Sequence, residues 1–399
     1  MTARDPIQSM PGDRGDGRAT LIYVVAGEAS GDVLGARLVA ALRERRPDLA
    51  FAGIGGERMA EAGVASLFPM RELALMGLLE VLPNLRNLAR RMRQTVEDVT
   101  ARRPVAVVTI DSPGFAMRLA ARVRPLGMPV IHYVAPQVWA WRPGRVKEMA
   151  HRLDRILALL PFEAPFFERA GIPVSFVGHP VLESGADRGD GARFRARHGL
   201  APHERVVIVM PGSRRTEIAR LLPIFGETLR LLHRDVPGLR PVVALAGPVE
   251  EAVRAAAAGW PAAPILVREV EDKHDAFAAA AAGLIKSGTS SLEVALAGVP
   301  MVVGYRVNPV TAEIVRRLVK VRYASIVNLL ADAPVIPEYL QQRCRPDLLA
   351  AELGELLAGG PRTAAQREGF ARVLRLLSPA SGESPSGAAA DAVLATAGL

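Results

Sequence analysis

The sequence predicts an α/β fold with two domains, each built on a parallel sheet with helices on both faces. Short apolar runs alternate with longer amphipathic segments along most of the chain. This alternation, with short loops between the elements, is typical of doubly wound sheets. A chain of 399 residues is long enough for about two domains of ordinary size.

The first group of elements lies in residues 19–180, which we expect to form an N-terminal Rossmann-like domain. Residues 1–18 are polar and rich in Gly, Asp and Arg, so we expect a disordered leader. After it, an apolar run is followed by a Gly-bearing loop and a helical pattern that begins at Val33. Helical segments separate most of the later runs, and the expected strands are 20–26, 51–54, 105–110, 130–134 and 156–160.

A second group of elements predicts a C-terminal Rossmann-like domain over residues 201–350. Gly, Asp and Arg dominate residues 178–199, and we therefore place a linker at 181–200. The expected strands are 206–210, 241–247, 265–267, 282–288 and 301–305, with a helix at 290–297. Residues 351–399 are expected to hold C-terminal helices, a low-complexity tail at 378–390 and a terminal helix at 389–397.

Composition excludes several classes of protein. Cys344 is the only cysteine, so an intramolecular disulfide and a thiolate zinc site are both excluded. No apolar stretch reaches the roughly 18–20 residues that span a bilayer, and the first residues lack the apolar core of a signal peptide. These features predict a cytoplasmic protein. The net charge of +9 favours phosphates, nucleic acid or anionic lipid as partners.

Two loops after predicted strands have the composition of diphosphate-binding loops. In the first, Gly288 permits a tight turn, Thr289 or Ser290 can cap the next helix, and Glu293 can accept hydrogen bonds from a ribose. A plain capping box, Ser290-x-x-Glu293, explains the same residues without a ligand. In the second, Gly212 and Ser213 precede Arg214, whose guanidinium can pair with a phosphate. An ordinary turn with a solvated arginine is the alternative.

Two carboxylates follow predicted strands of the N-terminal domain. Asp111 comes directly after an apolar strand, where partial burial would raise its pKa toward the range of a general base. The alternative is an aspartate that starts a turn. Glu28 lies in a loop of small residues after the first strand and can bind sugar hydroxyls. In that loop, Ser30 or Asp32 can also serve as a helix N-cap.

Residues 73–93 combine leucines with four arginines, which is typical of a basic amphipathic element that lies on an anionic membrane. A core-facing helix with a solvated basic face is the alternative. Trp139 and Trp141 lie in a loop after a strand, where they can line a cleft or pack at a domain edge. The sequence has no Cys/His cluster, HExxH or Asp-x-Asp motif. We therefore expect neither a metal nor another cofactor.

Taken together, these segments resemble the lipid-A-disaccharide synthases, a family of membrane-associated glycosyltransferases. The resemblance covers residues 20–340 in order. Its strings are AGEASGD (26–32), GIGGERM (53–59), MGLLEVLP (76–83), IDSPGF (110–115), YVAPQVWAWRPGR (133–145), FVGHP (176–180), PGSRRTEI with LPI (211–224) and KSGTSSLEVALAGVPMVVGYR (286–306).

The resemblance implies a GT-B fold, with two Rossmann-like domains facing across a cleft and final helices that cross back. It implies a reaction between UDP-2,3-diacylglucosamine and 2,3-diacylglucosamine 1-phosphate. The products are the β-1,6-linked lipid A disaccharide 1-phosphate and UDP, with inversion at the anomeric carbon. One in-line displacement of this kind needs a base for the acceptor hydroxyl and stabilisation of the leaving diphosphate.

The resemblance also implies residue roles. Asp111 matches the candidate base and Glu28 an acceptor-site carboxylate. Arg214 matches an arginine near the UDP diphosphate, with Gly212 and Ser213 as backbone donors. The remaining matches are Gly288, Thr289 and Ser290 at the diphosphate, Glu293 at the ribose, and Asn328 as a functional residue of the late segment. The sequence Ser112-Pro113-Gly114 after Asp111 departs from relatives, which puts the geometry of that loop in question.

Both substrates of the family are diacylated, so the resemblance favours a protein that docks peripherally on the anionic inner-membrane surface. The residues expected to dock are Leu75, Met76, Leu78, Leu79 and Leu82. Relatives form dimers through exchanged C-terminal parts, which leaves a homodimer open. Nucleic acid is not expected as a partner, because no RNA-recognition or zinc-finger motif is present and the arginines are spread along the chain.

Three competing interpretations remain at this point. Another GT-B enzyme, either a transferase that moves N-acetylglucosamine from UDP to an undecaprenyl-linked acceptor or a 2-epimerase, would share the nucleotide half but lack GEASGD and the Trp139–Trp141 loop. A basic nucleic-acid-binding protein would show steeply salt-dependent DNA binding. A non-catalytic lipid-binding relative would have little reason to keep Glu28, Asp111, Arg214 and Glu293.

Overall fold

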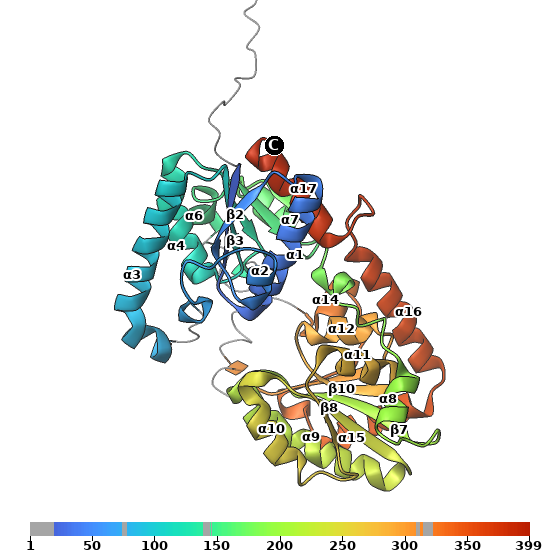
Figure 1. Ribbon diagram of the computed structural model, residues 1–399. Helices are drawn as coiled ribbons and strands as arrows, with labels where there is room; N and C mark the ends of the chain where they lie inside the picture. The colour runs from blue at the N-terminus through green and yellow to red at the C-terminus, as the bar shows by residue number, and fades with distance from the viewer. Residues whose placement is uncertain (1–19, 74–77, 139–143, 145, 309–311, 314–321) are drawn as a thin grey trace, which may run out of the picture. The chain divides into compact units, whose positions relative to one another are not determined.

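The computed structural model describes residues 20–73, 78–138, 144, 146–308, 312–313 and 322–399, without the side chains of residues 78–84 and 248. Figure 1 shows two sheets flanked by helices. The pattern of contacts between residues divides the chain into two compact units. One unit runs up to Ile131 and includes Val393–Leu399, and the other is His132–Ala392.

The first sheet has six strands in the lateral order β2-β1-β3-β4-β5-β6. β1 pairs in parallel with β2 on one side and with β3 on the other. Every predicted strand of this half is present, and β6 is an additional strand. The strands are β1 Leu21–Ala26, β2 Ala50–Ile54, β3 Ala106–Ile110, β4 Val130–Tyr133, β5 Arg155–Ala158 and β6 Val174–Phe176.

Helices connect these strands and cover the sheet. The side chains of β1 from Ile22 to Ala26 are buried, as the apolar run of the sequence predicts for a central strand. The helical elements of this part are α1 Ala29–Arg45, α2 Glu57–Glu61, η1 Met70–Glu72, α3 Leu78–Arg102, α4 Pro113–Val123, η2 Arg124–Leu126, α6 Val146–Ala150 and α7 Ala164–Glu168.

The second sheet also has six strands, in the order β12-β11-β10-β7-β8-β9. The predicted strands are confirmed, although β8 and β10 begin and end earlier than expected, and β12 is an additional strand. The bounds are β7 Arg205–Met210, β8 Leu239–Ala244, β9 Ile265–Val267, β10 Ala280–Lys286, β11 Met301–Tyr305 and β12 Glu338–Leu340. The predicted α/β class with parallel sheets is therefore confirmed.

Alternate residues of β7 enter two separate cores, one on each face of the second sheet. Val206 and Ile208 pack with residues of α8, α11, α12, α14 and α16. Val207 and Val209 pack with residues of α9, α10 and α15. Figure 1 shows α9, α10 and α15 together on one side of this sheet. Side chains of a strand alternate between faces, so a strand covered on both sides must be apolar throughout.

The helical elements of the second part were only partly predicted. The terminal helix predicted at 389–397 is present and begins earlier, at Pro385, so that it includes the end of the low-complexity segment 378–390, where Ala389 and Ala390 are buried. These elements are η4 Pro180–Glu183, α8 Gly191–Arg197, α9 Arg215–Asp235, η5 Gly247–Val249, α10 Glu250–Ala257, α11 Val270–Ala279, α12 Ser290–Leu296, α14 Ile326–Ala331, η6 Gln341–Arg343, α15 Pro346–Ala358, α16 Pro361–Leu376 and α17 Pro385–Ala397.

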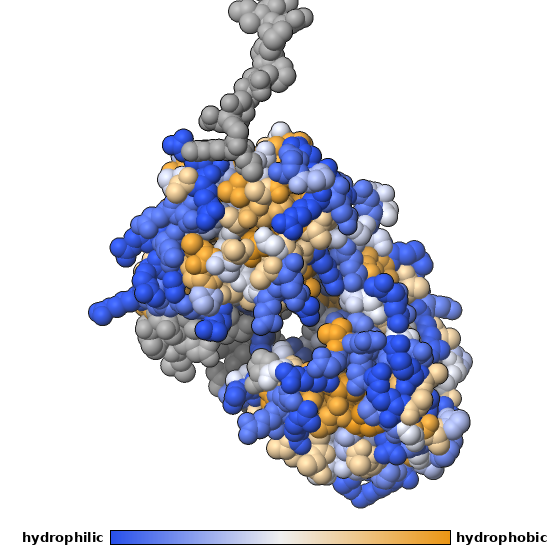
Figure 2. All heavy atoms as spheres, in the orientation of Figure 1, coloured by the Kyte–Doolittle hydropathy of each residue, from blue (hydrophilic) through white to orange (hydrophobic). Residues whose placement is uncertain are grey.

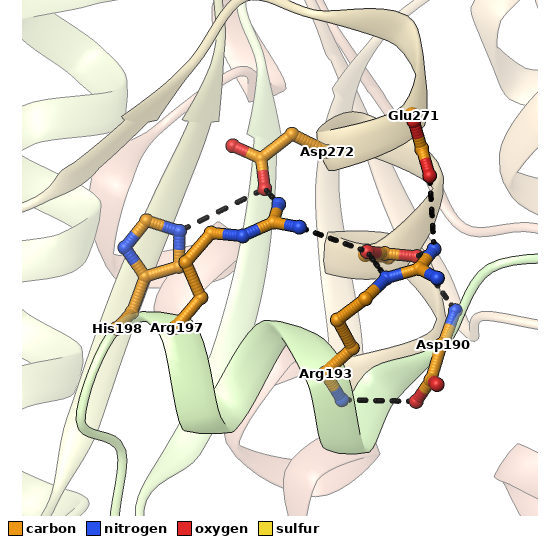
Figure 3. A network of polar contacts seen from close by, with 7 residues as sticks. Asp190, Arg193, Arg197, His198, Glu271 and Asp272 are labelled. Atoms are coloured by element: carbon orange, nitrogen blue, oxygen red, sulfur yellow. Dashed lines mark hydrogen bonds and ion pairs between the residues drawn. The ribbon is translucent and has the colours of Figure 1, made fainter.

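The segment expected as a linker, residues 181–200, contains helix α8, which polar contacts hold against α11 (Figure 3). The buried carboxylate of Asp275 accepts hydrogen bonds from Arg193 at 2.7 and 2.8 Å and from the backbone N–H of Asp190 at 2.7 Å. Arg197 forms a second ion pair with Asp272. Charge pairing therefore fixes a helix that has few apolar residues of its own.

Polar and charged residues cover much of the surface shown in Figure 2, with apolar atoms visible between them. The large apolar side chains that are exposed among the described residues are scattered along the chain: Val33, Leu85, Leu126, Val270, Leu376 and Leu399. None of the helices in the described ranges has the length and apolar character needed to cross a membrane.

Candidate functional site

In the first sheet, the strand order reverses beside β1, because β2 lies on one side of it and β3 on the other. Ligands of open α/β sheets bind outside the carboxyl ends of the strands at such a switch point. Ala26 and Ile110 are register partners at the ends of β1 and β3. Glu28 and Asp111 therefore leave neighbouring strand ends at this position.

Asp111 and Ser112 form a strained turn between β3 and α4. Both have left-handed backbones, with φ values of 52° and 46°. Two consecutive non-glycine residues in this region are costly, and such strain is concentrated at functional sites. The backbone N–H of Ser112 donates to Asp111 Oδ1 at 2.8 Å. Burial raises the pKa of the Asp111 carboxyl above its ordinary value, and the hydrogen bond from Ser112 opposes this shift.

Gly27, in the loop of Glu28, packs against Ser112 in the loop of Asp111. A Cβ atom on Gly27 would lie 2.3 Å from Ser112 Oγ and 2.6 Å from Ser112 Cβ. Real Cβ atoms do not approach neighbours so closely, so only glycine permits this packing. The two acidic loops are thus in direct contact through one glycine and one serine.

We expect Gly27→Ala to lower kcat for the sugar transfer that the resemblance implies by about 10- to 100-fold. The added methyl group would displace the Asp111 loop, and small misplacements of reacting groups slow a reaction strongly. UDP binding should remain unchanged if the nucleotide binds the second sheet. Gly114→Ala is the matched control, since a Cβ atom there meets nothing within 4 Å. Steady-state kinetics and UDP titration of both variants check this expectation, and a fully active Gly27→Ala would contradict it.

Glu28 is partly buried and precedes α1, but its side chain makes no capping hydrogen bond to that helix. The expected N-cap at Ser30 or Asp32 is wrong, because α1 already begins at Ala29. Asp32 instead caps α2: its buried carboxylate accepts backbone hydrogen bonds from Gly56, Arg58 and Met59 at 2.7, 3.0 and 3.1 Å. Asp32 therefore holds α2 against α1.

The second sheet has its switch point between β7 and β10, because β8 and β9 lie on one side and β11 and β12 on the other. Met210 and Ile285 are register partners near the ends of these two strands. The two predicted diphosphate loops follow β7 and β10, so the fold places them side by side.

Three charged residues lie between these loops, and we call them the Glu217 cluster: Arg214, Glu217 and Lys286. Glu217 Oε1 is 3.2 Å from Lys286 Nζ and 3.5 Å from a terminal nitrogen of Arg214. The predicted residues Gly212 and Ser213 lie directly before Arg214, the N-cap residue of α9. Sequence reasoning missed Glu217 and Lys286, although Lys286 is the last residue of an otherwise apolar strand and that position is a usable signal.

The loop after β10 places Gly288, Thr289 and Ser290 at the start of α12. Gly288 has a φ of 154°, which favours glycine, and Thr289 is the N-cap residue without a side-chain capping hydrogen bond. The capping-box interpretation of Glu293 is wrong. Its carboxylate instead accepts hydrogen bonds from Lys273 Nζ at 3.1 and 3.3 Å.

Asn328 is buried in α14 and its amide is used within the protein. Its nitrogen donates to the backbone oxygen of Ile336 at 2.7 Å and to Glu338 Oε1 at 2.8 Å. Its oxygen accepts from the backbone N–H of Ile336 at 2.8 Å. Asn328 therefore fixes the segment that leads into β12, and any influence on substrate would pass through that segment.

The residues expected to dock on a membrane lie outside the described residues: Leu75 and Met76 entirely, and Leu78, Leu79 and Leu82 in their side chains. Trp139 and Trp141 lie outside them as well. From residue 85 onward, α3 has a buried face with Met92, Thr95 and Val99. Its exposed arginines are Arg86, Arg90, Arg93 and Arg102, whereas Arg91 pairs with Glu72 at 2.6 Å.

A cleft of about 550 Å³ is lined by residues of β12, α15, α16 and the segment before β12. None of the predicted site residues lines it. Its charged lining consists of Glu338, Arg343, Glu352, Arg362 and Arg372. Across the described ranges, no group of three His, Cys, Asp or Glu residues is placed to hold a metal ion. The expected absence of a metal remains a prediction.

Solved structures share the fold of this chain. A putative UDP-N-acetylglucosamine 2-epimerase from Listeria monocytogenes has a TM-score of 0.64 and 14% identity, over 94% of this chain and 95% of that one. MurG from Acinetobacter baumannii has a TM-score of 0.58 and 16% identity, over 94% and 99%. Identities this low show the fold alone, and the predicted GT-B fold is confirmed.

Sequence comparison separates this chain from those neighbours. A family model described as lipid-A-disaccharide synthetase matches residues 22–392. The lipid-A-disaccharide synthase of Granulibacter bethesdensis is 57% identical over 345 residues, covering 86% of this chain and 88% of the relative. That of Rhodospirillum centenum is 52% identical over 377 residues, covering 94% of each. The chain therefore belongs to the lipid-A-disaccharide synthase family.

Proposed function

We propose that this chain, as an enzyme of lipid A biosynthesis, transfers the sugar of UDP-2,3-diacylglucosamine to the 6-hydroxyl of 2,3-diacylglucosamine 1-phosphate. Asp111 takes the hydroxyl proton while the acceptor oxygen attacks the anomeric carbon. The bond from that carbon to the UDP oxygen breaks, and the configuration inverts. The products are the lipid A disaccharide 1-phosphate and UDP.

The observation that carries this proposal is that carboxylates follow the first switch point and glycine-rich, cationic loops follow the second. A half-buried carboxylate with a raised pKa suits proton abstraction. Positive charge beside positive-φ glycines suits a diphosphate that leaves without a metal. Glu28 binds the acceptor sugar in this scheme, and Glu293 binds the ribose of UDP.

We place the acceptor and the membrane on the N-terminal domain, residues 19–180, and the UDP-sugar on residues 201–350. Residues 351–399 would then cross back to the first domain. One contact with the end of this domain supports this course of the chain, although it lies within the unit His132–Ala392: the backbone N–H of His179 donates to Leu377 O at 3.0 Å. The inclusion of Val393–Leu399 in the first unit supports it too.

A UDP-release assay with both diacylated substrates in detergent micelles tests the function. We expect release that requires the acceptor and persists in EDTA, because Arg and backbone groups would replace a metal at the diphosphate. No release from folded protein would exclude this substrate pair, and activity abolished by EDTA would exclude the metal-independent scheme. Disaccharide must be detected as the product, since hydrolysis and epimerisation of a UDP-sugar give different products.

We further propose that the protein docks peripherally on the cytoplasmic side of the anionic inner membrane, through residues 75–82 and the exposed arginines of α3. Leu75→Glu combined with Leu79→Glu should abolish binding to anionic vesicles, because charge would replace apolar contact. The matched control is Val270→Glu with Leu376→Glu, two exposed positions with the same change in charge. Sedimentation with vesicles measures binding, and unchanged binding by the first variant would contradict this docking.

A further inference from the structure

The Glu217 cluster contains a buried carboxylate that its protein neighbours do not fully satisfy. Glu217 is only 6% exposed. One of its oxygens lies near both Lys286 and Arg214. The other oxygen, Oε2, has no hydrogen-bond partner in the part of the chain that the structure describes. A buried charge is costly unless it is paired, so this carboxylate needs its two cations.

Two glycines leave room for this arrangement. A Cβ atom on Gly212 would lie 2.9 Å from Glu217 Oε2 and 3.4 Å from Lys286 Cδ. A Cβ atom on Gly288 would lie 3.2 Å from Lys286 Nζ. The lysine stem therefore runs along the loop after β7, and its ammonium group lies beside the loop after β10. Lys286 thus touches both loops at the switch point.

The composition of the chain makes this lysine informative. Only four of the 50 basic residues are lysines. Two of the three described lysines, Lys273 and Lys286, pair with the carboxylates of Glu293 and Glu217. The third, Lys147, is exposed on α6. An ammonium is a compact point charge, whereas a guanidinium is a wide planar fork, so the two are not interchangeable in a restricted space.

We propose that Lys286 is a substrate-binding cation for the diphosphate of the sugar nucleotide and that Glu217 is its positioning residue. This inference rests on the function proposed above. Lys286 remains 18% exposed and Arg214 62% exposed, so a ligand can reach both, whereas Glu217 lies behind them. Two cations and one carboxylate give the cluster a net positive charge. This charge stabilises the leaving UDP more strongly as negative charge develops on it.

Titration with UDP and with uridine separates the diphosphate from the nucleoside. Lys286→Met should raise the Kd for UDP by about 10- to 100-fold, the range of one lost charge-assisted hydrogen bond. The Kd for uridine should stay unchanged. Lys286→Arg keeps the charge but not its shape, so its Kd for UDP should fall between those of wild type and Lys286→Met. Lys147→Met is the control, and it should bind UDP like the wild type.

Glu217→Gln tests positioning. If Glu217 holds the ammonium in place, the variant should bind UDP about 3- to 10-fold more weakly, although the site becomes more positive. Tighter UDP binding would overturn the positioning role, because it would show that Glu217 only reduces the attraction. The near-UV circular dichroism of each variant reports whether it is folded. If Glu217→Gln is unfolded, Glu217→Asp replaces it, and its shorter side chain should weaken UDP binding in the same direction.

The failure of this inference differs from the failure of the proposed function. If wild-type protein binds neither UDP nor uridine, the proposed function is wrong. If wild type binds UDP and Lys286→Met binds it equally well, the function stands and the role of Lys286 is wrong. A variant that weakens uridine and UDP binding equally would also overturn the role, because the effect would not concern the diphosphate.

Discussion

Replacing Asp111 with asparagine is expected to lower kcat for disaccharide formation by about 10³-fold, with little change in the Kd for UDP. A general base contributes typically 10²- to 10⁴-fold to a rate, and the amide of asparagine cannot take the proton. Asparagine is preferable to alanine here, because it tolerates the positive φ of Asp111 and alanine does not. Backbone damage is thereby separated from loss of chemistry.

The pH dependence gives this prediction a second measurement. A base must be deprotonated to act, so kcat of the wild type should fall as pH drops through the pKa of Asp111. Burial raises that pKa, so the fall should begin above the value of about 3.9 that an ordinary aspartate would set. The residual activity of Asp111→Asn should lack this acidic limb. Wild-type-like activity in the variant would move the base elsewhere, and Glu28 would be tested next.

Most strands were predictable because each is a buried apolar run, and a strand covered on both faces must be apolar throughout. Two strands were missed, β6 at Val174–Phe176 and β12 at Glu338–Leu340. Both are three residues long and partly exposed, and each lies at the edge of its sheet. An edge strand is fixed by backbone pairing with its neighbour. A short sequence that mixes polar and apolar residues gives little indication of such pairing.

The candidate site was predictable where it depends on the end of a strand and not where it depends on contacts between distant segments. The sequence places Asp111 after β3 and Arg214 after β7, and parallel topology then brings the loops together. The pairing of Glu293 with Lys273 joins residues on two different helices. The use of Asp32 to cap α2 is similar, because spacing along the chain does not identify a partner that only the fold supplies.

The segment at 181–200 shows how charge can order residues that composition assigns to a linker. Helix α8 has a single buried apolar side chain, Phe194. Its position is set instead by Arg193 and Arg197, whose partners lie on α11. Apolar periodicity is the main signal of a helix in a sequence. A helix held mainly by ion pairs lacks this periodicity and is therefore not predicted from it.

Asp275→Asn is therefore expected to release α8 and to lower the free energy of unfolding of this unit by about 2–3 kcal/mol. Breaking a buried pair by removing one charge costs roughly 3–5 kcal/mol, and Arg193 is 45% exposed, so water can recover part of its hydration. Asp272→Asn is the matched control, because Asp272 also pairs with α8 but is partly exposed, where ion pairs contribute about 1 kcal/mol or less.

Hydrogen exchange of the α8 amides measures the effect, and the pH dependence fixes its origin. Arg193 holds the pKa of Asp275 below its ordinary value. The charged pair therefore contributes fully above the unfolded pKa of about 3.9, and its contribution is lost as pH falls through the lower folded pKa. Faster exchange in Asp275→Asn should be evident at neutral pH and should diminish in acid, where the wild type loses the same charge. Equal exchange in Asp275→Asn and Asp272→Asn at neutral pH would show that the buried pair does not fix α8.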